Sequence, residues 1–292
     1  MHEYRQDVAF SAGRVTLRGW YFRPEGEGPW PIVVMSHGFS ALKEMDLDRY
    51  AAVLRDAGLG CLVYDHRNLG SSDGEPRGEI DPWQQIADMR YAITFAASLP
   101  GADRERVGLW GTSYSGGHSL VVSAIDRRVR CVVFQAGTID SHAAAMRRLG
   151  TDGIASLRRR AYDDLEARAA GRAPVYLNVA EPGSESYSYL VESFPDSGYD
   201  NLVTLRSREL ALGYWPGIYV ERIAPTPLLM IVAGKDEQTP TDLQLAAFAR
   251  AGEPKRLFTI DDARHYDVYK RYFNETSSAA RDWLSQHLMQ SS

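Results

Sequence analysis

The stretch of sequence that decides the fold is Val107-Gly-Leu-Trp-Gly-Thr-Ser-Tyr-Ser-Gly-Gly117. Its first four residues are typical of a buried strand, and the residues from Tyr114 onward are typical of a helix. A serine on such a sharp turn projects its hydroxyl group at the carboxyl edge of a sheet. There the free N–H groups of the helix N-terminus face any developing negative charge. We therefore interpret Ser113 as a nucleophile.

The stretch departs at one position from the G-x-S-x-G pattern of nucleophilic serines. Gly111 fits the pattern, but Ser115 stands where the second glycine is expected. Ser115 is the competing nucleophile, but it would lie inside the helix with a less exposed hydroxyl group, so Ser113 is preferred. The alternative interpretation is a phosphate-binding turn, which the absence of a G-x-x-x-x-G-K-[ST] motif disfavours.

Strands and helices alternate on both sides of this stretch. After a two-stranded meander in 5–22, apolar runs predict strands at 32–35, 62–64, 107–110, 129–134, 228–232 and 257–260. Helical spacing predicts helices at 44–57, after Asp81, at 114–124, at 240–251 and at 276–288. The sequence therefore predicts an α/β fold with a mostly parallel, doubly wound sheet.

The alternation stops between residues 138 and 225. This segment predicts polar helices at 141–149 and 154–170 and a short strand at 175–179. Because sheet elements lie on both sides of it, we expect a core in two parts, 1–137 and 226–292, interrupted by a helical cap insertion at 138–225. The insertion leaves and rejoins the sheet at its carboxyl edge, so it is predicted to cover the site. The side chains expected to face inward are Ile154, Leu157, Leu165, Leu190 and Trp215, and the substrate-pocket candidates are Tyr214 and Trp215.

Two later loops at the same edge carry polar residues suited to catalysis. Gly234-Lys-Asp236 follows the strand at 228–232, with Glu237 beside it, and His265 follows the strand at 257–260. His287 lies on the terminal helix, where a surface histidine is expected.

These motifs resemble those of the α/β-hydrolase superfamily. Two further stretches carry the same resemblance, Ser36-His-Gly-Phe39 and Tyr64-Asp-His-Arg-Asn-Leu-Gly-Ser-Ser-Asp73. The resemblance is to its dienelactone hydrolase and acetyl xylan esterase-like branch, over about the first half and the last quarter of the chain. The Gly-Thr-Ser-Tyr-Ser-Gly-Gly variant is also similar to polyketide acyl transferases and thiohydrolases. The resemblance implies an α/β-hydrolase fold with a triad in the chain order nucleophile, acid, base.

That order assigns Ser113 as nucleophile, Asp236 as orienting acid and His265 as general base. Asp236 is preferred to Glu237 because it lies nearer the end of the strand. The oxyanion hole is predicted from the backbone N–H groups of Tyr114 and Phe39.

Composition narrows the partners. The chain has 292 residues and a formal net charge of −5, which disfavours nucleic acid, and the run Arg158 to Arg160 is interpreted as a salt-bridged solvated face. Cys61 and Cys131 begin apolar runs and are expected to be buried thiols. No cofactor or metal is expected. No apolar run is long enough for a membrane span, and the polar N-terminus lacks the core of a signal peptide, so a cytoplasmic location is expected by default.

The function predicted from these residues is a serine hydrolase that forms an acyl-enzyme from a carboxylic ester, thioester or lactone. The alternatives are acyl transfer to an alcohol or amine, a peptidase, and a catalytically inactive hydrolase fold that binds a partner. The expected partner is a small-molecule acyl substrate, and a homodimer is left open.

Overall fold

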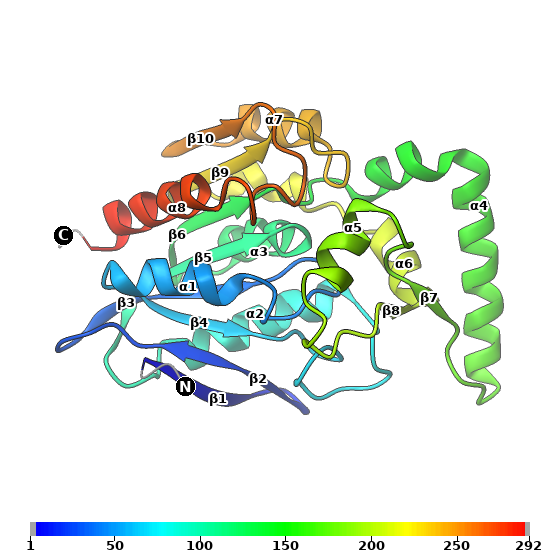
Figure 1. Cartoon of the computed structure of the whole chain (residues 1–292), viewed down its shortest axis with the longest axis horizontal. Coiled ribbons are helices and arrows are strands. Elements are labelled where there is room, and N and C mark those ends of the chain that lie inside the picture. The colour runs from blue at the N-terminus through cyan, green and yellow to red at the C-terminus, as the bar shows by residue number, and fades with distance from the viewer. Residues whose placement is uncertain (1–3, 290–292) are drawn as a thin grey trace.

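The computed structural model describes residues 4–289, and its centre is an eight-stranded sheet (Figure 1). The strands are β1 Arg5–Ala12, β2 Val15–Phe22, β3 Trp30–Ser36, β4 Gly60–Tyr64, β5 Ala102–Thr112, β6 Val129–Gln135, β9 Leu228–Ala233 and β10 Lys255–Ile260. Their order across the sheet is β1-β2-β4-β3-β5-β6-β9-β10. The pairs that involve β1 and β2 are antiparallel, and all the other pairs are parallel. The predicted α/β class and mostly parallel sheet are confirmed.

Apolar runs form the central strands because helices cover both faces of the sheet. Every residue of β3, β4 and β9 is buried, as expected of parallel strands covered on both sides. Helices α1 Leu47–Asp56 and α8 Phe273–Leu288 lie on one face, and α2 Pro82–Ala96 and α3 Tyr114–Ile125 lie on the other (Figure 1). The Asp81 side chain accepts hydrogen bonds from the backbone N–H groups of Trp83 and Gln84 at the start of α2. Cys61 and Cys131 are free and buried in the core.

Much of the segment between β6 and β9 forms a separate layer at one end of the sheet, whereas its last part packs against α3 (Figure 1). Its elements are α4 Ser141–Ala169, β7 Tyr176–Asn178, α5 Glu185–Tyr187, the π-helix η1 Ser188–Glu192, β8 Leu202–Thr204, α6 Leu205–Leu212 and the 3₁₀-helix η2 Pro216–Arg222. The two predicted helices at 141–149 and 154–170 are the two halves of α4, which bends at Gly150, where φ is 65°. Helix α7 Thr241–Arg250 then follows β9 in the second part of the core.

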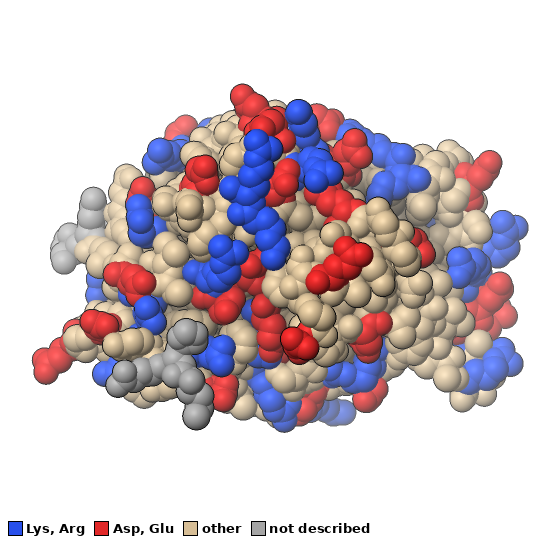
Figure 2. All heavy atoms as spheres, in the orientation of Figure 1, with Lys and Arg blue, Asp and Glu red and all other residues tan. Residues whose placement is uncertain are grey.

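The surface is of mixed charge. Acidic and basic side chains are intermingled across the face seen in Figure 2. Within residues 4–289, no helix is both long enough and apolar enough to cross a bilayer.

Candidate active site

Ser113 lies between the end of β5 and the start of α3, in a backbone conformation that side chains rarely adopt. Its φ is 53° and its ψ is −122°, the strained turn expected of an exposed nucleophile. Its backbone N–H donates to the Gln135 carbonyl group at the end of β6, which fixes the turn on the sheet. The turn has no room for a side chain at Gly111, because a Cβ there would lie 2.2 Å from the Ser115 carbonyl oxygen. The hydroxyl group of Ser113 therefore stands at the carboxyl edge of the sheet.

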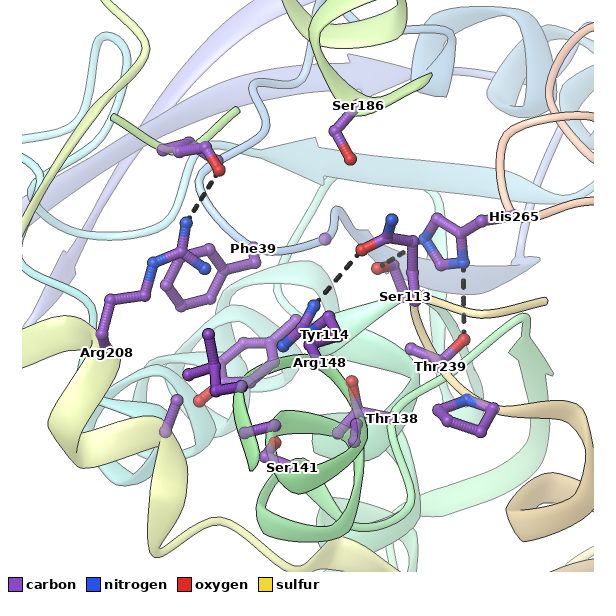
Figure 3. A pocket seen from close by; sticks show the side chains of 18 of the residues that line it. Phe39, Ser113, Tyr114, Thr138, Ser141, Arg148, Ser186, Arg208, Thr239 and His265 are labelled. Carbon is purple, nitrogen blue, oxygen red and sulfur yellow. Dashed lines mark hydrogen bonds between the residues drawn. The ribbon is translucent and has the colours of Figure 1, made fainter. Parts of the chain in front are cut away.

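The loops after β9 and β10 bring an acid and a base to this serine. His265 Nε2 lies 3.0 Å from Ser113 Oγ (Figure 3). On the other side of the ring, His265 Nδ1 lies 2.7 Å from Asp236 Oδ2. Because an ionised carboxylate only accepts hydrogen bonds, Nδ1 carries the proton and Nε2 is free to accept from the serine. His265 is 2% exposed and Asp236 is 4% exposed, so both are shielded from water.

The Asp236 carboxylate is held by three further donors. The backbone N–H groups of Gln238 and Thr239 each lie 2.9 Å from Oδ1, and Thr239 Oγ1 donates to Oδ2 at 2.7 Å. Glu237, the competing acid, is exposed. The sequence analysis did not predict this role of Thr239. The signal in the sequence is its spacing, because a residue three positions after Asp236 can donate to the carboxylate across one turn.

Ser115, the competing nucleophile, is enclosed in the protein. It is fully buried, and its Oγ lies 2.8 Å from His66 Nε2. Burial lowers the pKa of His66 to about 4, so this histidine is neutral at physiological pH. Ser115 therefore links α3 to the loop that follows β4.

The loop after β3 lies directly against Ser113. A Cβ added to Gly38 would lie 2.8 Å from the Cβ of Ser113 and 2.9 Å from its Oγ. His37 anchors the loop, because its Nε2 lies 2.7 Å from the Met45 carbonyl oxygen. In the described part of the chain, the backbone N–H groups of Phe39 and Tyr114 have no acceptor. Both donors thus remain available to a ligand beside Ser113.

A cavity of about 650 Å³ opens from Ser113 between the sheet edge and the insertion. His265, Phe39 and Tyr114 line it on the core side (Figure 3). The insertion contributes much of the wall, and its aliphatic residues there include Leu149, Leu157, Leu177, Leu190 and Leu212. The hydrogen bonds that tie the insertion to the core include Ser40 Oγ to the Tyr199 hydroxyl group at 2.7 Å and the Tyr266 hydroxyl group to Ser186 Oγ at 3.0 Å.

The two residues predicted for the substrate pocket do not line this cavity. Tyr214 is fully buried behind Tyr114, with its hydroxyl group 2.7 Å from His118 Nδ1. Trp215 is 52% exposed at the start of η2, where it faces solvent. Leu165, also expected to face inward, is 37% exposed because it lies on the outer side of α4.

The interpretation of the arginine run as salt-bridged is also wrong. Within residues 4–289, Arg158, Arg159 and Arg160 form no ion pair, and Asp164 pairs instead with Arg168 at 2.8 Å. Arg160 lies at the wall of the cavity.

A mostly parallel sheet with a strained serine between strand and helix defines an α/β-hydrolase. The family model for X-Pro dipeptidyl-peptidase (S15 family) matches residues 13–171. Polyketide transferase grgF of Penicillium sp is 31% identical, over 97% of both chains, and a thiohydrolase of Eupenicillium brefeldianum is 31% identical, over 90% of this chain and 88% of that one. The crystal structure of the α/β-hydrolase GrgF from Penicillium sp. sh18 superposes with a TM-score of 0.85 at 29% identity, over 98% of this chain and 99% of that one.

The chain belongs to the α/β-hydrolase superfamily and, within it, to the family that the S15 model describes, and it is related to the polyketide transferase and the thiohydrolase. It is an enzyme of that class, and the predicted resemblance is confirmed.

Proposed function

We propose that the protein is a serine hydrolase that forms an acyl-enzyme on Ser113. The observation that carries the proposal is the continuous set of hydrogen bonds from Ser113 through His265 to Asp236 at the wall of a cavity. General-base catalysis requires the base to lie within hydrogen-bond reach of the proton that it removes, and 3.0 Å satisfies this.

Each residue has one task in the reaction. Ser113 Oγ bonds to the acyl carbon as its proton passes to His265 Nε2. His265 then protonates the leaving group, whose bond to the acyl carbon breaks as the carbonyl bond re-forms. In the second half His265 takes a proton from water as the water oxygen attacks the acyl carbon. The bond to Ser113 Oγ then breaks, His265 returns the proton to Ser113 Oγ, and the acid leaves. Asp236 holds the imidazole tautomer and stabilises the imidazolium without taking the proton.

The negative charge on the tetrahedral intermediate needs two donors. Phe39 and Tyr114 offer backbone N–H groups on the two segments that flank Ser113. Removal of one such donor typically costs about 100- to 1000-fold in kcat.

The substrate class that we propose is a carboxylic ester or thioester. Two relatives of similar length are named a thiohydrolase and a polyketide transferase, which supports acyl groups carried on oxygen or sulfur. We do not propose the peptidase activity in the family model's name. Three guanidinium groups at the cavity wall, those of Arg148, Arg160 and Arg208, disfavour the ammonium group of a free peptide N-terminus.

Acyl transfer is the second candidate. A cavity of about 650 Å³ has room for an acceptor beside an acyl group, and one relative is named a transferase. Added methanol and ethanolamine test it, because a transferase yields the methyl ester or the amide in excess over the acid, measured by mass spectrometry.

A fluorophosphonate probe tests the proposed nucleophile. We expect one adduct, on the peptide that contains Ser113, and a loss of about 10⁶ in kcat for Ser113→Ala on p-nitrophenyl acetate. Ser115→Ala is the matched control and should retain labelling. Labelling that persists in Ser113→Ala and disappears in Ser115→Ala would refute the proposal.

A further inference from the structure

The cavity wall contains a guanidinium group that is surrounded by protein and has no carboxylate partner. Arg208 lies on α6, and one of its N–H groups donates to the Val179 carbonyl oxygen at 2.8 Å. A guanidinium group has five N–H donors, so this bond leaves most of them free. In residues 4–289, Arg208 forms no ion pair. Burial, followed by the charge of Arg148, lowers the pKa of Arg208 to about 10.

Arg208 lies next to the groups that flank the nucleophile. Its guanidinium carbon is 4.9 Å from the centre of the Phe39 ring, and that ring packs edge-to-face on Tyr114 at 5.2 Å. Figure 3 shows Arg208 and Phe39 side by side at the cavity wall, with Ser113 and His265 across it. An anion bound by Arg208 would therefore share the cavity with an acyl group on Ser113.

Arg148 is a second cation at the same wall. It extends from α4 and donates to the Gln238 side-chain oxygen at 3.3 Å (Figure 3). Arg148 is exposed, although the protein around it lowers its pKa by desolvation. Within the described chain, no carboxylate pairs with it.

The carboxylates at the wall do not neutralise these two cations. Asp140 accepts a hydrogen bond from the Ala143 backbone N–H and so caps α4. Glu181 is exposed and forms no ion pair within residues 4–289. Charges removed from water are normally paired, because desolvation is otherwise uncompensated. Arg208 is such a desolvated and unpaired charge within residues 4–289, and the exposed Arg148 and Arg160 add two further unpaired guanidinium groups at the same wall, so the cavity is suited to an anionic ligand.

On the basis of the acyl-enzyme chemistry proposed above, we propose that the substrate carries an anionic oxygen group apart from its reacting carbonyl. Arg208 binds this group, with Arg148 as a second donor, while the aliphatic wall holds the rest of the molecule. The anion is a carboxylate or a phosphate, since both accept hydrogen bonds from a guanidinium group in the same way. A carboxylate would belong to the acyl chain, and a phosphate would belong to a leaving group such as a phosphopantetheine thiol.

Two matched substrate pairs distinguish these sources. The first pair is p-nitrophenyl hexanoate and mono-p-nitrophenyl adipate, which differ by a terminal carboxylate. The second is the pantetheine and 4′-phosphopantetheine thioesters of hexanoate, which differ by the phosphate of the leaving group. We expect kcat/KM to favour the anionic member of one pair by at least tenfold.

Arginine variants connect that preference to the cavity. We expect Arg208→Gln to reduce the anionic-to-neutral ratio of kcat/KM by at least tenfold, and Arg208→Lys to retain part of it because the charge remains. Arg147→Gln is the matched control, because Arg147 neighbours Arg148 in the chain but pairs with Asp242 outside the cavity. This control should leave the ratio unchanged.

The outcomes separate this inference from the proposed function. Ester turnover that depends on Ser113, with a ratio near one in both pairs, would overturn the anion site and leave the hydrolase intact. If Arg208→Gln does not fold, the anionic-to-neutral ratio of kcat/KM is measured for Arg208→Lys and Arg148→Gln in its place. A ratio equal to that of the wild type in both variants would overturn the inference. Calorimetry on the Ser113→Ala variant tests the anion site without turnover. It compares the affinities for hexanoate and inorganic phosphate with the affinity for hexanol, the neutral reference ligand. Equal binding of hexanol and both anions would also overturn it.

Discussion

Replacement of Gly38 by alanine tests how tightly the loop after β3 holds the nucleophile. The added Cβ would lie 2.8 Å from the Cβ of Ser113 and 2.9 Å from its Oγ. The favourable separation of two carbon atoms is about 3.5–4.0 Å, so the loop or the serine must move by about 0.7 Å or more. The same Cβ would lie 3.8 Å from the Tyr114 backbone nitrogen, beside the proposed oxyanion hole.

The expected effect on catalysis is larger than the effect on stability. A displacement of about 1 Å in a reacting group costs on the order of 100-fold in rate, so we expect kcat/KM of Gly38→Ala to fall about 100-fold, or about 2.7 kcal/mol. Overpacking of one methyl group typically destabilises a protein by about 1–3 kcal/mol, which leaves most domains folded.

The assay is the hydrolysis of p-nitrophenyl acetate, with urea unfolding as the measure of stability. Gly213→Ala is the control, because a Cβ there meets only the Leu210 carbonyl oxygen at an ordinary 3.6 Å. The control should retain wild-type kcat/KM. A folded Gly38→Ala variant with kcat/KM within threefold of wild type would show that the loop does not position Ser113 as we infer.

Three further predictions follow from the site and the core. Asp236→Asn should reduce kcat by about 10⁴ with the fold intact, and a loss under tenfold would remove its orienting role. Burial lowers the pKa of His37 and of His66 to about 4 from 6.5, so the folded state binds fewer protons than the unfolded chain. The free energy of unfolding, measured with urea, should be highest above pH 6.5. Between pH 6.5 and pH 4 it should fall by about 1.4 kcal/mol per pH unit for each of these histidines. A free energy of unfolding that does not change over this range would contradict the prediction. Leu212→Phe should shift the kcat/KM preference toward p-nitrophenyl esters with shorter acyl chains, because the larger side chain narrows the cavity. Trp215 is exposed, so Trp215→Ala should leave the ranking of these esters unchanged. The reverse result would contradict the assignment of Leu212, and not Trp215, to the cavity wall.

The mostly parallel sheet could be predicted because each central strand is buried on both faces and so appears as an apolar run. The run at 228–232, for example, lies within β9, in which every residue is buried. The first and last residues of the helices were predicted less accurately. The last helix begins at Phe273 rather than near residue 276, because its first turn carries Asn274 and Glu275, which have no apolar spacing.

The candidate triad could be proposed because its three members each follow a strand. Parallel strands end at the same edge, so Ser113, Asp236 and His265 were expected there before any distance was known. Packing adds a second reason for the preference for Asp236 over Glu237, since one is buried against Thr239 and the other is exposed.

The insertion shows what the sequence did not contain. Tyr214 and Trp215 were selected as large aromatic residues, but the part of the cavity wall that the insertion contributes includes many aliphatic side chains, the arginines Arg148, Arg160 and Arg208, and a different aromatic residue, Tyr189. The short elements of the insertion carry no regular spacing of apolar residues in the sequence, so the sequence does not specify which side of each element faces the core.

The sequence by itself thus determined the sheet, the strained serine and the order of the polar loops, because strand burial and turn stereochemistry leave local patterns in the chain. Only the tertiary structure decided which insertion residues line the cavity, because that depends on how α4 and α6 pack against Phe39 and Tyr114, far away in the sequence. It also decided that Arg208 has no carboxylate partner within residues 4–289, because pairing depends on which acids the fold brings close. Asp140 and Glu181 reach the same cavity wall, yet one caps α4 and the other faces solvent, and the guanidinium group is left free for a ligand.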